Sequence, residues 1–433
     1  MPWMWGFDIP THGGGTTALK NLMDGMLIMR GVNTHNSAHL QAAALHYRPN
    51  SIPASFGGMA ADNSTKPIAA VEMGCVEYRY RSQKGSSPIN LQAGDDMLSQ
   101  LLSPFIKKNL TGYSSNQSKV AAALEIGLDS LSSLSLTNDP ISNIVKKNME
   151  SATELFSSNF GNLETAYNNL YIKYKNLITR VLDPSNVLVG INDKPVGASS
   201  GRGREYCYSS SYSAIRNDDL RTIITSGSNL DALAQRFAVT EFVILNGLSS
   251  NVCFDASNLK SLNIPGGQSA QITDSHFGGT MPNLIINTYA DLSFSACLYE
   301  FISQLKAHNI YEKTVIDYCG EFGRIPIDSG EGSDHCSESN ANMLLSGAIN
   351  GSHVIGNISA NKGAGDGKTA ATGHGTWGRG AINGTTGLLD LNHFTSTLSN
   401  LMGLPSPITS TPSLVREENG KFVPILPTGK IIV

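Results

Sequence analysis

The sequence predicts an α/β fold, a doubly wound and mostly parallel sheet with a helical insertion. Short apolar runs between turn signals, such as 25–32 and 68–73, are typical of buried strands. From about residue 229 onward, helical and strand patterns alternate, which favours parallel strands joined by crossover helices. A chain of 433 residues exceeds the usual domain size, so we expect a single domain over 1–433 that carries an insertion.

The first half of the chain continues with helical patterns. Residues 91–108 place their apolar side chains on one helical face. Residues 115–182 are helical in pattern almost throughout, and 184–228 are rich in Gly, Ser and Asn. We therefore expect a helical and loop-rich insertion over 110–228.

The second half returns to alternating elements. The sequence predicts, in order, a helix at 229–238 and the strand VTEFVILNGL, a helix at 286–308 and the strand TVIDYCG, a strand NMLLSGAI, a long loop at 357–386 and a helix at 388–402. Catalytic groups of such folds lie on loops beyond the carboxyl ends of the strands.

Composition narrows the classes of partner and location. Charged residues make up 15% of the chain, whereas about 25% is average, and the net charge is -4 without a basic stripe. We therefore expect no nucleic-acid partner. The longest apolar runs are too short for a membrane span. No signal peptide is visible, so the chain is either cytosolic or a processed form. The low charge favours the processed form of a periplasmic or extracellular protein.

The segment 317–336, DYCGEFGRIPIDSGEGSDHC, carries the densest set of chemical groups. An apolar strand ends there and is followed at once by Glu321 and Arg324, and then by Asp334 and His335. Carboxylates and imidazoles on such a loop can bind one ion. The alternative is a histidine held by its neighbour in a surface loop.

A second pair, Asp274 and His276, precedes the helix at 286–308. In an extended segment these alternate residues point to one side. Both motifs offer oxygen and nitrogen ligands and no thiolate, so they favour a divalent ion, zinc or manganese.

These residues resemble a known family. GEFGRIP followed by GSDH is similar to the (S/G)EFGRTP…G-x-DH signature of a large, mostly uncharacterised bacterial family within the alkaline phosphatase/sulfatase superfamily. ITDSHFGG resembles its Trp-Asp-Thr-His element, and NTHNSAHLQAA resembles its early Asn/Ser-x-His patch. The resemblance covers about 20–75 and 230–405, and it implies an alkaline-phosphatase-like fold.

The resemblance also implies a ligand set. Asp274, His276 and His335 stand where the superfamily places the ligands of one metal, and Glu321 stands where a second metal's aspartate sits. Phe322 departs from the Asp-His pair of the metal-dependent phosphatases, so a ligand of the second site is missing. We therefore expect at least one divalent ion but not a full two-metal site.

The superfamily needs a nucleophile near a ligand aspartate after the first strand. The early candidates are Thr11 as the nucleophile and Asp8 as a metal ligand, in GFDIPTHGGG. Metal coordination would lower the pKa of the Thr11 hydroxyl. The alternative is a glycine-rich turn in which Asp8 is a cap or turn residue.

Two further residues are candidates for substrate contact. Arg324 could hold an anionic ester through its fork of donors, or form a structural salt bridge to Asp328 or Glu331. His39 belongs to the early patch of the family and is a candidate substrate-binding residue.

Two functions remain open at this point. The first is an exported metal-dependent hydrolase of phosphate-type esters, with an anionic small molecule or glycan ester as substrate. The second is a non-catalytic structural or binding component of an extracytoplasmic or cell-surface assembly, with protein partners. A shared fold does not decide between them.

Overall fold

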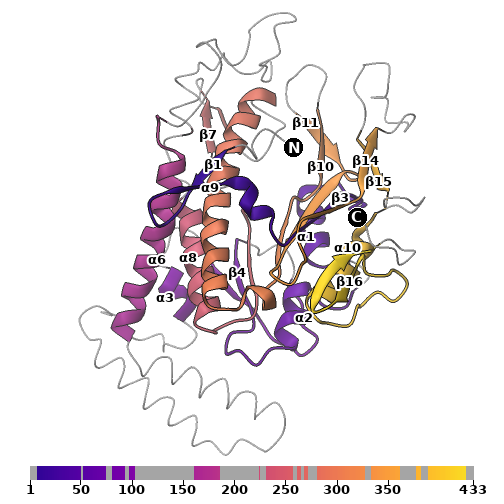
Figure 1. Ribbon diagram of the computed structural model, residues 1–433, viewed down its shortest axis with the longest axis horizontal. Coiled ribbons are helices and arrows are strands. Elements are labelled where there is room, and N and C mark those ends of the chain that lie inside the picture. Colours follow the sequence, from indigo (N-terminus) through magenta and orange to yellow (C-terminus); the bar gives the residue numbers. More distant parts are fainter. Residues whose placement is uncertain are drawn as a thin grey trace, which may run out of the picture. The chain divides into compact units, whose positions relative to one another are not determined.

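The protein forms two compact units. The structure is a computed structural model, and its ribbon is drawn in Figure 1. It describes residues 7–49, 52–74, 80–92, 97–102, 160–185, 224, 231–256, 261–264, 268–271, 280–326, 333–360, 377–381 and 389–425. The first unit comprises Met1–Pro53, Asn176–Asp231 and Ala256–Val433, and the second comprises Ala54–Lys175 and Ala232–Asp255.

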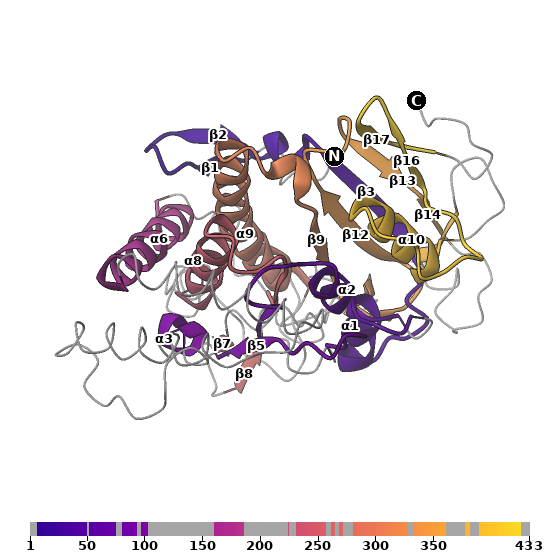
Figure 2. The same ribbon diagram turned by 90° about the horizontal axis from the view of Figure 1, so that it is seen from below.

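A four-stranded mixed sheet is the largest sheet of the first unit (Figure 2). Its strands, in spatial order, are β13 (His353–Ile355), β3 (Met26–Val32), β12 (Asn340–Leu345) and β9 (Ile316–Cys319). β12 runs antiparallel to both β3 and β9, whereas β13 runs parallel to β3. β3 is buried along most of its length, as expected for an apolar strand covered on both faces.

Two helices cover one face of this sheet, α1 (His39–Tyr47) and α10 (Leu391–Leu401). His46 of α1 lies against Asn342 of β12. The same imidazole meets the ring of Phe394 of α10 edge-on, with the ring centroids 6.2 Å apart. The two helices therefore lie side by side.

The long helix α9 (Thr280–Ala307) covers the opposite face. Phe294 of α9 stacks on Tyr318 of β9 with the ring centroids 4.6 Å apart. The strand register places Tyr318 and Asn342 at alternating positions, so their side chains leave the sheet on opposite sides. The mixed sheet is thus covered by helices on both faces.

The remaining strands of the first unit form antiparallel pairs. They are β1 (Asp8–Pro10) with β2 (Thr16–Ala18), β7 (Ser261–Ile264) with β8 (Gln268–Gln271), β10 (Gly323–Pro326) with β11 (Ser333–Cys336), β14 (Asn357–Ala360) with β15 (Trp377–Ala381), and β16 (Val415–Glu418) with β17 (Lys421–Pro424). Two short 3-10 helices, η2 (Leu19–Met23) and η7 (Tyr311–Lys313), also belong to this unit.

The second unit contains a three-stranded parallel sheet. Its strand order is β5 (Ile89–Leu91), β4 (Val71–Met73) and β6 (Val252–Phe254). Its helices are α2 (Phe56–Asp62), α3 (Met97–Leu102), α8 (Asp231–Leu245) and the residues up to Lys175 of α6 (Phe160–Val181).

The aromatic residues of α6 and α8 pack together in the core of the second unit. Tyr167 meets Phe242, and Tyr174 meets Phe237, with the ring centroids 6.5 Å and 5.4 Å apart. Tyr167 and Tyr174 of α6 are therefore core residues of this unit. The rest of the insertion predicted at 110–228 lies mostly outside the described residues.

The predicted doubly wound, mostly parallel sheet is wrong. The structure has a mixed four-stranded sheet, a small parallel sheet and several antiparallel pairs. The main reason is the connection from β9 to β12. This connection contains the β10–β11 hairpin but no helix within the described ranges, and parallel neighbours need a long crossover, usually helical. β12 therefore returns antiparallel to β9.

Two further element predictions are wrong. The segment VTEFVILNGL was expected as a strand, but its first seven residues are the second half of α8, buried in an unbroken run from Arg236 to Val243. A helix that is apolar on all sides has the same composition as a buried strand. The predicted loop at 357–386 contains β14 and β15. The strands and helices expected at 25–32, 286–308 and 388–402 are confirmed.

Among the helices of the described ranges, not one has the length and apolar character needed to cross a bilayer.

Candidate functional site

The directions of the strands bring two distant segments to one edge of the main sheet. β12 is antiparallel to both of its neighbours, so β3 and β9 point the same way. Their carboxyl ends, Val32 and Cys319, pair with Asn340 and Asn342 at the start of β12. The chain after β3 leads to α1, and the chain after β9 leads to Glu321. Both connections therefore leave the same edge.

His39 and Glu321 meet at this edge. The Nδ1 atom of His39, the first residue of α1, lies 2.6 Å from Oε1 of Glu321. The two side chains are 41% and 31% exposed, so solvent reaches the pair. A carboxylate that binds one imidazole nitrogen fixes the orientation of the ring.

The β10–β11 hairpin adds two residues from the same motif. Arg324 and His335 are direct partners across the hairpin. The His335 ring meets the His39 ring edge-on, with the centroids 4.5 Å apart. An Arg324 Nη atom lies 3.9 Å from Oε1 of Glu321, so the carboxylate faces both His39 and Arg324.

Phe322 packs within this cluster. Its side chain is buried, and its ring centroid lies 4.2 Å from that of His335 and 5.1 Å from that of His39. The Arg324 guanidinium also lies 5.1 Å from the Phe322 ring centroid, within range of a cation–π contact. Phe322 thus packs against three polar side chains of the cluster.

Gly323 allows the hairpin to approach the main sheet. A Cβ atom here would collide with Oγ of Ser339 and lie 2.8 Å from the Ser339 carbonyl carbon. Real Cβ atoms do not approach other atoms so closely, so a residue without a Cβ atom is required at this position. The glycine that separates Phe322 from Arg324 in the motif therefore has a packing role.

The candidate nucleophile and its neighbouring aspartate lie elsewhere in the first unit. Asp8 is an exposed residue of β1, and Thr11 follows in the turn between β1 and β2. Arg180 binds this turn, with 2.7 Å from its Nη1 to the carbonyl oxygen of Thr11. Figure 1 shows β1 beside α9 and away from β10 and α1, and Figure 2 shows the same separation of β1 from α1. The structure does not bring Asp8 and Thr11 to Glu321.

The other predicted metal ligands lie wholly or partly outside the described residues. Asp274 and His276 lie outside the described residues. The backbone of Asp334 is part of β11 and pairs with Ile325, but its side chain is not described. The predicted partners of Arg324, Asp328 and Glu331, also lie outside the described residues. Within the described residues, Glu321 is an acidic side chain that faces Arg324.

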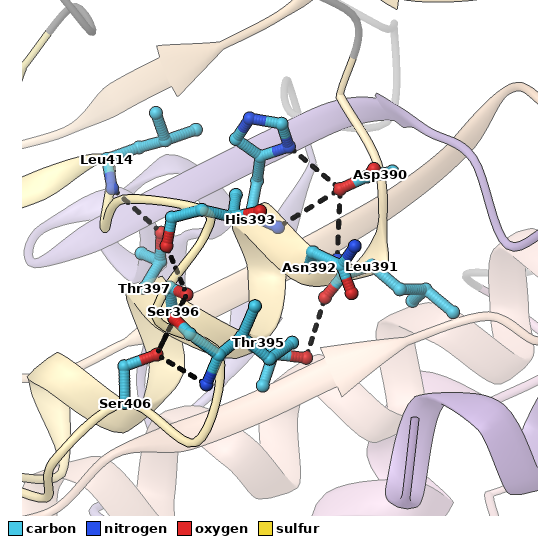
Figure 3. Close-up of polar contacts among 11 residues, drawn as sticks. Asp390, Leu391, Asn392, His393, Thr395, Ser396, Thr397, Ser406 and Leu414 are labelled. Carbon is cyan, nitrogen blue, oxygen red and sulfur yellow. Dashed lines mark hydrogen bonds and ion pairs between the residues drawn. The ribbon is translucent and has the colours of Figure 1, made fainter. Parts of the chain in front are cut away.

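A second carboxylate–imidazole pair lies at the start of α10 (Figure 3). Oδ1 of Asp390 accepts hydrogen bonds from the backbone of Asn392 and His393, and lies 2.8 Å from Nδ1 of His393. Burial alone would raise the pKa of Asp390, but its hydrogen bonds outweigh that effect and hold the pKa below its ordinary value. Asp390 is thus an N-cap that also orients His393.

His46, which is not among the predicted site residues, lies directly behind the cluster. Its ring nitrogens lie 2.8 Å from the amide nitrogen of Asn340 and 3.1 Å from that of Asn342. Asn340 in turn donates a hydrogen bond to the carbonyl oxygen of Gly320, next to Glu321. The seven-residue spacing of His39 and His46, which puts both on one side of a helix, was the available signal.

The described residues contain no set of three His, Cys, Asp or Glu side chains arranged to hold a metal ion. Asp274, His276 and the side chain of Asp334 are not among the described residues. Glu321 has one carboxylate oxygen, Oε2, without a hydrogen bond or ion pair within the described ranges. That atom can accept a further ligand.

A protein-family model matches residues 293–369, and its description is "Protein of unknown function (DUF1501)". The chain is similar to that family over this segment, which includes β9 to β14 and the residues Glu321, Arg324 and His335. His39 and Thr11 lie outside the match. No curated protein matches the chain, and no solved structure matches it.

Proposed function

We propose that the protein is an exported, metal-dependent hydrolase of phosphate-type or other anionic esters. One observation carries this proposal. His39, at the start of α1, meets Glu321, Arg324 and His335 of the segment after β9 at the edge where β3 and β9 end. Such a grouping of a carboxylate, two imidazoles and a guanidinium suits the binding and cleavage of an anion. The low charged fraction of the chain, 15%, favours export.

The donor atoms fit one divalent ion. Glu321 can offer Oε2 while Oε1 keeps its contact with His39. His335 supplies an imidazole nitrogen close by, and the family resemblance implies Asp274 and His276 as further ligands. Oxygen and nitrogen donors of this kind suit zinc or manganese.

The residues of the cluster divide the chemistry. A bound divalent ion would polarise a non-bridging oxygen of the ester. Arg324 binds the anionic group through its fork of donors. His39, oriented through Nδ1 by Glu321, takes a proton from the attacking water through Nε2 and delivers it to the leaving oxygen. The substrate class is an anionic small-molecule or glycan ester.

Elemental analysis of the purified protein tests the metal. We expect about one zinc or manganese ion per chain, and much less in Glu321→Ala and His335→Ala. His308→Ala is the matched control, because His308 is an exposed histidine at the end of α9 that contacts the carbonyl oxygen of Gln304. A wild-type metal content near zero after incubation with either ion would remove the metal from the proposal.

An assay with aryl phosphates and phosphodiesters tests the reaction. We expect hydrolysis that depends on added zinc or manganese and is lost in Arg324→Met. The same variant should keep its metal, because Arg324 has no acceptor atom for an ion. Absence of hydrolysis for every anionic ester tested, in protein that is loaded with metal, would contradict the enzymatic function.

The packing of Phe322 favours a second function. Its buried ring touches both imidazoles, so the cluster also has the character of a structural contact between α1 and the hairpin. A non-catalytic component of a cell-surface assembly would need this rigidity and no metal. That function predicts metal-free, inactive protein in which Phe322→Ala loosens the hairpin.

A further inference from the structure

Two buried asparagines occupy the start of the central strand β12. Asn340 and Asn342 are 3% and 0% exposed, and they lie two residues apart, so both side chains leave the sheet on the same face. Burying an amide costs free energy unless it is hydrogen-bonded. Apolar residues would fill these positions at lower cost, so the amides point to a specific role.

His46 of α1 lies between these amides. One ring nitrogen is 2.8 Å from Nδ2 of Asn340 and the other is 3.1 Å from Nδ2 of Asn342. Burial lowers the pKa of His46 to about 4, against the opposing effect of a hydrogen bond with the backbone of Glu321, so the ring is neutral near pH 7. A neutral imidazole donates through one nitrogen and accepts through the other. Both amides present Nδ2, which only donates, so one ring nitrogen accepts from an amide and the other donates to the backbone carbonyl of Glu321.

The network continues to the turn that carries the site. Nδ2 of Asn340 donates to the carbonyl oxygen of Gly320 over 2.8 Å. Gly320 directly precedes Glu321, whose side chain contacts His39. α1 thus contacts this turn in two ways. His39, its first residue, contacts the Glu321 side chain. His46 contacts Asn340, which donates a hydrogen bond to the Gly320 carbonyl oxygen.

The ends of the network are themselves fixed. Asn340 pairs with Val32 of β3, and Asn342 pairs with Cys319 of β9. The His46 ring also packs edge-on against Phe394 of α10. The side chains that hold the turn at Glu321 are therefore themselves held by two strands and a second helix.

We propose that His46, with Asn340 and Asn342, is a positioning residue that holds the backbone at Glu321 so that its carboxylate faces His39 and the bound ion. The expected effect of His46 on metal affinity rests on the proposed function. Its expected effect on the contact between His39 and Glu321 does not depend on that function.

Two substitutions of His46 separate positioning from packing. His46→Leu fills the space without a hydrogen bond, whereas His46→Gln keeps one donor and one acceptor on a neutral side chain. With zinc alone as the probe, we expect calorimetric titration to give a Kd about 10- to 100-fold weaker for His46→Leu and within about threefold of wild type for His46→Gln. His308→Gln is the control on the same unit.

A second readout does not need metal. In metal-free protein labelled with ¹⁵N-histidine, the ring nitrogens of His39 report their contact with Glu321. We expect these resonances to shift in His46→Leu towards their positions in Glu321→Gln, and to stay at the wild-type positions in His46→Gln. This measurement decides the inference even when the wild-type protein binds no zinc, an outcome that removes the proposed function alone.

The outcomes are distinct. A purely structural role predicts that folded His46→Leu, identified by its near-UV circular dichroism, keeps the wild-type His39 resonances and zinc affinity, which would overturn the inference. Should His46→Leu fail to fold, Asn340→Leu removes the hydrogen bond to Gly320 while leaving His46 in place, and the same two readouts apply. Failure of His46→Gln to retain the His39 resonances would also overturn it.

Discussion

Nδ1 of His39 lies 2.6 Å from Oε1 of Glu321, although 282 positions separate the two residues in the chain. The contact exists because β3 and β9 end at the same edge of the main sheet and α1 begins there. It joins the first residue of a helix to the turn of the GEFGR motif. The consequences of this contact for stability and for activity are expected to differ.

The pair should contribute little to stability. Both side chains are partly exposed, and ion pairs of this kind contribute about 0–1 kcal/mol. A double-mutant cycle with His39→Gln, Glu321→Gln and the double variant, measured by urea denaturation, should give a coupling below about 1 kcal/mol. Under the proposed function, His39→Gln should lower ester hydrolysis by about 100-fold or more. A large coupling without any loss of activity would assign the pair to structure instead.

Part of this arrangement could be predicted from the sequence. An apolar strand followed directly by Glu321 predicted a carboxylate at a strand end, and the Asn/Ser-x-His patch drew attention to His39. The strand order could not be predicted. The edge on which both residues lie depends on the directions of β3 and β9, which are the same even though the strand between them, β12, is antiparallel to both.

Other features were hidden for physical reasons. The run of β-branched and aromatic residues in α8 has the composition of a strand, and burial on all sides removes the helical period that would identify it. His46 carries no sign of its burial, because its partners Asn340 and Asn342 are almost 300 residues away in the chain. Tertiary context decides both cases.

Gly323→Ala should destabilise the hairpin. The new Cβ would meet the backbone and Oγ of Ser339, and overpacking of this kind costs about 1–3 kcal/mol. Gly13→Ala is a matched control, because a Cβ at Gly13 meets no atom within 4 Å. Adding Ser339→Gly to Gly323→Ala should restore part of the loss, since it removes one of the colliding atoms. Equal urea midpoints for Gly323→Ala and Gly13→Ala would be inconsistent with the close approach.

A buried ion pair joins α6 to α8 in the second unit. Nζ of Lys173 lies 2.6 Å and 2.8 Å from the carboxylate oxygens of Glu241, and the Tyr174 hydroxyl donates to the same carboxylate. Glu241→Gln leaves a buried ammonium group without its counter-charge, so we expect a loss of about 3–5 kcal/mol in the free energy of unfolding.

Replacing both charged partners should cost less. In Lys173→Met with Glu241→Leu no buried charge remains unpaired, and we expect this double variant to be more stable than Glu241→Gln alone. Lys175→Met, an exposed substitution on the same helix, serves as the control and should change stability by less than about 0.5 kcal/mol. If the double variant is the least stable of the three in urea denaturation, the pair contributes net stability, contrary to this prediction.

Acidification should destabilise the first unit through His46. The folded-state pKa of His46 is about 4, below the ordinary value of 6.5, so between these values the unfolded chain binds a proton that the folded chain does not. The contribution of the neutral ring is therefore fully present above pH 6.5 and is lost as the pH falls towards 4. The full difference corresponds to about 3 kcal/mol.

Carboxylates titrate over the same range, so the comparison that isolates His46 is wild type against His46→Gln, whose amide does not titrate. Urea denaturation at intervals from pH 7 to pH 4 should show the wild type losing stability faster than His46→Gln by up to this amount, and parallel curves for the two proteins would show that the folded protein accepts a proton on His46 as readily as the unfolded chain does.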